Sequence, residues 1–202
     1  GAGPGSFTIP FAQHIKSVTA IEPSKGMVAV LKENAKELGV ENFNIIEEMV
    51  QDLPQDGSFD SQFDVVAISL VLWMFPDVWP RILQMEQYSK GYCAIVAGIP
   101  DWKNPREASK SDVQEFQILY NMLLSQGRFP NVSVIDYKCE RMVEDEIECR
   151  KIIYEQYEGD LTPEAEEQIR KEVIARSKDN KCLISSRSAV IWWNPKEIVS
   201  PR

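Results

Sequence analysis

The sequence is poor in the residues that build most metal sites and hydrolytic triads. It contains one histidine, His14, and four cysteines that are scattered along the chain. No two cysteines have the C-x-x-C spacing that brings two thiolates to one metal ion, so we expect no metal site. A Ser-His-Asp hydrolase would depend on His14, which lies in a helical stretch without a partner motif. We interpret the cysteines as reduced structural thiols.

The sequence also lacks long apolar runs and an excess of basic residues. No run approaches the ~20 apolar residues that span a bilayer, and no secretory signal pattern is seen. Lysine and arginine number 22 against 31 aspartates and glutamates, which gives a net charge of -9. Such a chain does not form the broad basic face that neutralises phosphates. We therefore expect a cytoplasmic protein that binds neither membranes nor nucleic acid, and its oligomeric state stays open.

Predicted helices and strands alternate along most of the 202 residues. Apolar residues recur at helical spacing over 25–38, between a serine N-cap at Ser24 and a stop at Gly39. The nearly continuous apolar run over 63–70 is typical of a strand that is covered on both faces. Gly91 is expected to stop a helix over 77–89. Further predicted strands cover 18–22, 43–46, 92–97, 132–137 and 181–193.

This order predicts an α/β fold, with a largely parallel sheet and helices on both faces, in a single domain over 1–202. Two helices, the second capped by Thr162, form an expected helical insertion at about 143–179. Ligands of such sheets bind at the carboxyl ends of the strands, where the strand order switches. No strand precedes the glycine-rich turn at 1–5, so we expect the first strand of the sheet to lie upstream of Gly1.

The glycine-rich turn and one acidic residue indicate where a cofactor binds. Gly1, Gly3 and Gly5 let the backbone turn tightly and approach a ligand closely. Glu22 follows Gly5 by 17 residues at the end of a predicted strand. A carboxylate there can accept hydrogen bonds from both ribose hydroxyls. A nicotinamide-dependent oxidoreductase stays an alternative, although such enzymes usually have glycine at the position of Ser6.

Four motifs together resemble the class I S-adenosylmethionine-dependent methyltransferases, and most of all their broad type 11 group. The matching segments are G-A-G-P-G at 1–5, A-I-E-P-S at 20–24, Q-D-L-P at 51–54 and F-D-V-V at 63–66. The resemblance implies a Rossmann-like class I methyltransferase sheet, S-adenosylmethionine as the cofactor and methyl transfer as the reaction. Segments 119–123 and 188–193 are similar to a little-characterised microbial branch, which leaves the methyl acceptor open.

The resemblance also implies a set of cofactor contacts. The turn residues Gly1, Ala2, Gly3 and Gly5 would face the methionine part of the cofactor, and Glu22 would hold the ribose. The remaining cofactor-binding positions, beside the adenine or after the fourth strand of the family, would be Pro23, Met49, Val50, Ser69, Leu70 and Leu72. Plain core packing is the alternative for the two leucines.

One of these positions departs from the family pattern. Met49 stands where family members often have an acid that accepts the adenine amino group. Backbone groups near Val50, or Glu48, would then serve, and the Met49 thioether would pack beside the adenine ring. The missing acid is the one feature that favours a non-catalytic, S-adenosylmethionine-binding regulatory protein.

The acceptor is expected to be a small molecule. The run over 68–71 lacks the motif with which amino-group methyltransferases of nucleobases and glutamine bind their acceptors. No Pro-Cys pair offers a thiolate that could attack cytosine. We expect acceptor contacts from Trp73, Trp102 and Tyr120, with core or surface packing as the alternative. No catalytic residue is assigned, because a general base is needed only if the acceptor must lose a proton.

Overall fold

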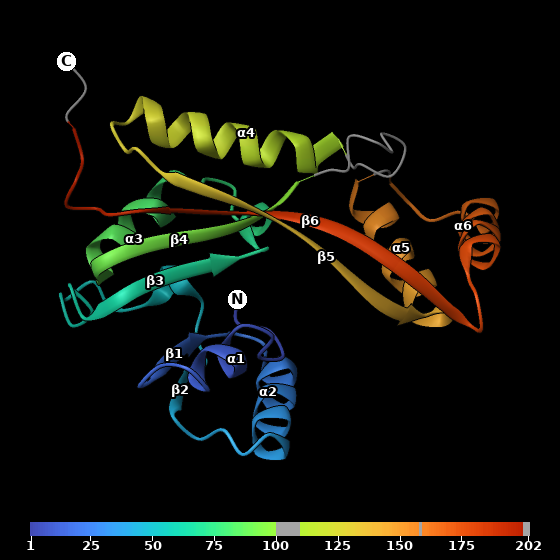
Figure 1. Cartoon of the computed structure of the whole chain (residues 1–202), viewed down its shortest axis with the longest axis horizontal. Coiled ribbons are helices and arrows are strands. Elements are labelled where there is room, and N and C mark those ends of the chain that lie inside the picture. Colours follow the sequence, from blue (N-terminus) through green and yellow to red (C-terminus); the bar gives the residue numbers. More distant parts are fainter. Residues whose placement is uncertain (100–109, 158, 200–202) are drawn as a thin grey trace. The chain divides into compact units, whose positions relative to one another are not determined.

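The computed structural model describes residues 1–99, 110–157 and 159–199 (Figure 1). The α-helices are α1 Thr8–Ala12, α2 Lys25–Glu37, α3 Trp79–Tyr88, α4 Lys110–Ser125, α5 Val143–Tyr157 and α6 Pro163–Arg176. The strands are β1 Val18–Ile21, β2 Phe43–Ile46, β3 Phe63–Ser69, β4 Ser89–Ile99, β5 Asn131–Met142 and β6 Lys181–Trp193. Two short 3₁₀ turns, η1 Val50–Asp52 and η2 Leu72–Met74, follow β2 and β3. Helices and strands therefore alternate through much of the chain, as predicted.

Several helix ends are fixed by residues close in the sequence. The Ser24 hydroxyl accepts a hydrogen bond from the Met27 N–H at 3.4 Å at the start of α2. Gly39, just after the end of this helix, has a φ of +63°. Thr162 accepts from the Ala165 N–H at 3.2 Å at the start of α6. These contacts confirm the predicted caps and the predicted stop.

The strands form two sheets within the described residues. β1 and β2 pair in parallel, with Val18 opposite Phe43 and Ile21 opposite Ile46. The other four strands follow the order β3-β4-β6-β5, and β3 and β4 are parallel. The parallel pairs confirm the predicted α/β fold. The expectation that a further strand precedes Gly1 stays a prediction.

Gly91 has a different role from the helix stop that the sequence predicted. Helix α3 ends at Tyr88 and β4 begins at Ser89, so Gly91 lies inside the strand. A Cβ atom at this position would collide with the Asp64 carbonyl oxygen of β3, where the pairing of the two strands is irregular. The prediction was wrong because the close approach of a neighbouring strand, rather than the end of a helix, selects glycine here.

Contacts group the described chain into two compact units. The first unit consists of Gly1–Ala97, Leu119–Val132 and the described residues from Val190 onward. One of its core clusters joins α1 and α2 through Ile9, Ala12, Ala35 and Val40. This unit contains β1 to β3 and therefore carries the glycine-rich turn and the ends of these strands.

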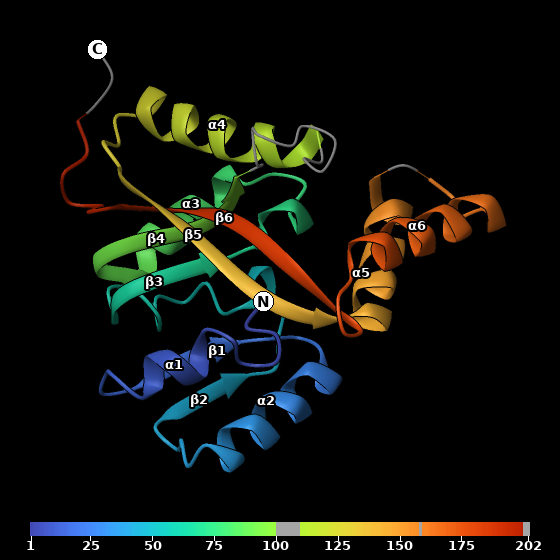
Figure 2. The same ribbon diagram turned by 45° about the vertical axis from the view of Figure 1, so that its right-hand side comes forward.

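The second unit includes Ser133–Ala189, in which α5 and α6 lie side by side (Figure 2). The side chains that form its core cluster are Val143, Ile147, Val173 and Cys182. The expectation of a single domain with an insertion at about 143–179 stays a prediction. Among the described helices, none is both long and apolar enough to span a membrane.

Candidate functional site

The glycine-rich turn is closed by its own backbone. The Gly5 N–H donates to the Ala2 carbonyl at 3.3 Å, and Gly3 and Gly5 have φ values of +56° and +93°. A Cβ atom on Gly5 would lie 2.9 Å from Ile9 Cδ1 and 3.0 Å from Leu31 Cγ, whereas no atom lies within 4 Å of the same position on Gly3. Gly5 is therefore required by packing and by its backbone conformation, and the backbone at Gly3 is open to a ligand.

Glu22 holds this turn at the end of β1. Its residue surface is only 6% exposed. One carboxylate oxygen accepts from the Gly3 N–H at 2.8 Å, and the other accepts from the Ser24 N–H at 3.0 Å. The Ala2 N–H donates to the Ile21 carbonyl at 3.0 Å and ties the turn to the same strand end. Because a carboxylate offers about four acceptor positions, two remain for other donors, and this number fits the two hydroxyls of a ribose.

The segment after β3 contacts the same turn. A Cβ atom on Gly1 would lie 3.1 Å from Val71 Cγ1, so these two residues are neighbours. Leu70 has a φ of +55°, which bulky residues rarely adopt, and its N–H donates to the Val96 carbonyl at 2.9 Å. Backbone strain of this kind is concentrated beside ligand sites. These contacts bring the segment after β3 to the glycine-rich turn and to β4.

The predicted residues after β3 differ in exposure. Ser69 is half-buried at the end of the strand, and Leu70 is 47% exposed. Leu72 is only 2% exposed, and this burial favours the core-packing alternative for its side chain. Pro23 is exposed beside Glu22. Ser69, Leu70 and Pro23 are therefore accessible to a ligand, whereas Leu72 is part of the core.

The loop after β2 is held by a residue that the sequence analysis did not identify. Met49 precedes η1 with its residue surface 43% exposed, and its carbonyl accepts from the Asp52 N–H at 2.9 Å. The Val50 carbonyl accepts from Gln84 Nε2 of α3 at 2.9 Å. No sequence motif marks Gln84, because its partner is 34 residues away. The Met49 side chain is accessible, and the Val50 carbonyl is already bound within the protein.

The predicted acceptor-binding residues are distributed over two elements. Trp73 lies in η2, close in sequence to the strained Leu70. Tyr120 is half-buried on α4. Trp102 lies outside the described residues. An acceptor site that includes these aromatic residues stays a prediction.

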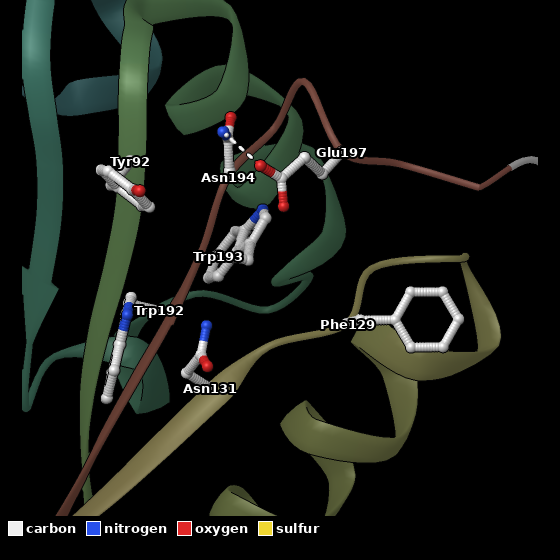
Figure 3. A pocket seen from close by; sticks show the side chains of 7 residues that line it. All are labelled: Tyr92, Phe129, Asn131, Trp192, Trp193, Asn194 and Glu197. Carbon is white, nitrogen blue, oxygen red and sulfur yellow. Dashed lines mark hydrogen bonds between the residues drawn. The ribbon is translucent and has the colours of Figure 1, made fainter.

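A separate cavity of about 290 Å³ lies near the amino end of β4 (Figure 3). Its lining residues are Tyr92, Phe129, Asn131, Trp192, Trp193, Asn194 and Glu197. Tyr92 pairs with Val65 early in β3, whereas Ser69 at the carboxyl end of β3 pairs with Val96. Trp193 also donates from its indole nitrogen to Glu86 at 2.8 Å. The cavity is therefore not part of the predicted cofactor site.

Cys93 is a structural thiol in the interior of β4. Its side chain is fully buried, and this burial, with a smaller effect of the Glu86 carboxylate, raises the pKa of the thiol to about 12. The thiol is therefore protonated at neutral pH and does not act as a nucleophile. For this residue, the interpretation from the sequence is confirmed.

Comparison with known proteins shows which family model and which solved structures the chain resembles. Residues 1–86 match the family model of a methyltransferase domain. The chain resembles a protein of Bacillus halodurans C-125 that is provisionally assigned as a methyltransferase, with 15% identity, a TM-score of 0.60 and coverage of 96% of this chain and 89% of that chain. The YcgJ protein of Bacillus subtilis gives 16% identity, a TM-score of 0.58 and coverage of 96% and 88%. No curated protein matches the chain.

The name of a third similar structure states its cofactor. An S-adenosylmethionine-dependent methyltransferase of Aquifex aeolicus has 17% identity and a TM-score of 0.54, over 67% of this chain and 72% of that chain. At these identities the solved structures show the shared fold. The family match covers the glycine-rich turn, β1, β2 and the segment after β3, which are the elements that the observed contacts join. Residues 1–86 therefore match the methyltransferase-domain family, and this match together with the shared fold implies S-adenosylmethionine as the cofactor.

Proposed function

We propose that this enzyme transfers a methyl group from S-adenosylmethionine to a small-molecule acceptor in the cytoplasm. The observation that carries the proposed site is the buried carboxylate of Glu22, which two backbone N–H groups hold at the end of β1. The net charge of -9 disfavours a nucleic acid as the acceptor. The four cysteines are free thiols, as is usual in proteins of a reducing compartment.

Each proposed cofactor contact has a distinct physical role. The turn residues from Gly1 to Gly5 present bare backbone to the methionine part of the cofactor. Glu22 accepts hydrogen bonds from the ribose hydroxyls through the acceptor positions that its backbone partners leave. The flexible thioether of Met49 packs against the adenine ring. The other proposed contacts are Pro23, Val50, Ser69 and Leu70.

The proposed role of the protein in the reaction is alignment. When bound, S-adenosylmethionine supplies a methyl group on a positively charged sulfur. The acceptor attacks the methyl carbon in line with this sulfur, and the sulfur is displaced. Holding two reactants in line contributes ~7 to 11 kcal/mol in favourable intramolecular cases. Glu22 suits this role because its two backbone contacts fix the carboxylate before a ligand arrives. Trp73, Trp102 and Tyr120 are the proposed contacts for the acceptor.

Two other functions have weaker support. A nicotinamide-dependent oxidoreductase would share the turn and Glu22, but Ser6 stands where such enzymes usually have glycine. A non-catalytic regulatory protein is supported only by Met49 in place of an acid. Neither the fold nor the family match favours these alternatives.

Titration calorimetry with S-adenosylmethionine, S-adenosylhomocysteine and the reduced nicotinamide cofactors tests the proposed site. We expect the first two to bind and the nicotinamide cofactors not to bind. Incubation of the protein with methyl-labelled cofactor and a fractionated cell extract then tests the acceptor class. Label in the small-molecule fraction supports the proposal, and label confined to RNA or DNA overturns it.

A further inference from the structure

Gln84 is a buried polar residue in the middle of α3. It is 7% exposed, and its neighbours Ile82 and Met85 on the same helix are also buried. An amide in such a position costs free energy unless its polar atoms have partners. The partners of Gln84 therefore indicate why a glutamine is present at this position.

The contacts of Gln84 fix the orientation of its amide group. The nitrogen donates to the Val50 carbonyl at 2.9 Å and to the Tyr88 hydroxyl oxygen at 2.8 Å, and the amide oxygen accepts from Arg81 at 2.6 Å. An arginine side chain can only donate and a carbonyl can only accept, so these partners permit a single orientation. The amide is fixed at both ends, and so is the position of the Val50 carbonyl.

The hydrogen bond to Val50 joins two segments of the proposed cofactor site. Val50 is the first residue of η1, which follows β2, and Leu53 anchors the end of this turn with 2% exposure. The segment of Leu70 and Val71 precedes helix α3 in the chain, and Val71 contacts Gly1 of the glycine-rich turn. Gln84 therefore ties the loop after β2 to the helix that follows the end of β3.

We propose that Gln84 is a positioning residue that holds Met49 and Val50 beside the adenine of the cofactor and thereby sets the preference for adenine over other purines. The inference rests on the proposed function, because it takes Met49 and Val50 as neighbours of the adenine. Adenine and hypoxanthine differ at one edge, where the amino donor is replaced by a carbonyl acceptor and the adjacent ring nitrogen changes from an acceptor to an N–H donor. Backbone groups at fixed positions distinguish a donor from an acceptor, whereas a loop that can move adapts to both.

The test compares the binding of S-adenosylhomocysteine and S-inosylhomocysteine by titration calorimetry. The proteins are the wild type, Gln84→Met and a control, Gln87→Met. Gln87 lies on the same helix, is exposed and donates to Asp60 at 2.8 Å. We expect the wild type and the control to prefer the adenine compound. Gln84→Met is expected to reduce this preference at least about fivefold by weakening only the binding of the adenine compound.

Three results would overturn the inference. Equal losses of affinity for both ligands in Gln84→Met are the result of a merely structural role. If the wild type binds S-adenosylhomocysteine and S-inosylhomocysteine equally well, there is no preference for adenine that Gln84 could set, although the proposed function stands. A wild type that binds neither ligand overturns the proposed function together with the inference.

A second variant keeps the test decisive if Gln84→Met is unfolded at the assay temperature. Gln84→Glu retains an oxygen for Arg81 but places a carboxylate oxygen against the Val50 carbonyl oxygen. Two acceptors repel each other, so we expect this variant to lose the preference for adenine as well. A folded Gln84→Glu protein with the wild-type preference would overturn the inference.

Discussion

Two buried glutamates show two ways to keep a carboxylate inside this protein. Glu22 in the first unit and Glu146 in the second are 6% and 5% exposed. Glu146 accepts from Arg141 at 2.6 Å and from Arg150 at 2.7 Å. Glu22 accepts instead from two backbone N–H groups. Two guanidinium groups pair with the Glu146 carboxylate, whereas only backbone N–H groups orient the Glu22 carboxylate.

The difference distinguishes a structural ion pair at Glu146 from the proposed ligand site at Glu22, although the two residues are almost equally buried. Arg150 follows Glu146 by one helical turn on α5, a spacing at which opposite charges stabilise a helix. Glu22 follows a strand and faces a turn of glycines, which places it where ligands of parallel sheets bind. The partners of a buried carboxylate therefore indicate its role better than the depth of its burial. Substitutions at three positions, Glu22, Glu146 and Met49, test this comparison and the proposed site around Glu22.

The largest effect is expected for Glu22→Ala. Hydrogen bonds to a charged acceptor contribute roughly 1.5 to 3 kcal/mol each, so losing the ribose contact should weaken S-adenosylmethionine binding at least tenfold. The substitution also leaves the Gly3 and Ser24 N–H groups without their acceptor, so the melting temperature should fall. The affinity of Glu22→Gln should lie between those of the wild type and Glu22→Ala, because its amide keeps one oxygen acceptor and loses the charge. Titration calorimetry with melting curves measures both effects, and equal affinity in all three proteins contradicts the assignment.

The second effect is expected for Glu146→Ala, on stability alone. The substitution leaves Arg141 and Arg150 without their shared partner, but their side chains are 35% and 31% exposed and water can replace part of the contact. We expect the free energy of unfolding to fall by about 1 to 3 kcal/mol. Affinity for S-adenosylmethionine should not change, because Glu146 belongs to the second unit. Urea denaturation and calorimetry check this, and a tenfold loss of affinity in a folded variant would remove the distinction between the two glutamates.

The smallest effect is expected for Met49→Asp. The side chain at this position is accessible, so a carboxylate needs no burial and can accept from the adenine amino group. We expect S-adenosylmethionine affinity to stay the same or to increase a few-fold, with little change in stability. Calorimetry on the folded variant measures this. Abolished binding without unfolding would show that the loop after β2 does not border the adenine.

Much of the fold follows from local patterns that the sequence displays. The cap at Ser24 and the stop at Gly39 bound α2 as predicted, and Thr162 does the same for the start of α6. The spacing between the glycine-rich turn and Glu22 placed the acid at a strand end, where the structure has it. The predicted helix caps and the helix stop succeed because each depends on backbone conformation or on hydrogen bonds between residues a few positions apart.

Other features could not be predicted in this way. Gly91 reads as a helix stop in the sequence, and its collision partner is on a neighbouring strand. The left-handed conformation of Leu70 has no local cause in its side chain, since leucine disfavours it. Gln84 has the same sequence context as many exposed helical glutamines. Each of these roles depends on a neighbour that only the folded chain supplies.

The sequence by itself determined the glycine-rich turn, the acid that follows β1 and the bounds of several helices, because the groups involved are close along the chain. Only the tertiary structure decided how these parts act together. It turned the Glu22 carboxylate toward an N–H group 19 residues away, and it placed the Gln84 amide on a carbonyl 34 residues away. Such pairs depend on how strands and helices pack, and a local pattern is compatible with many packings.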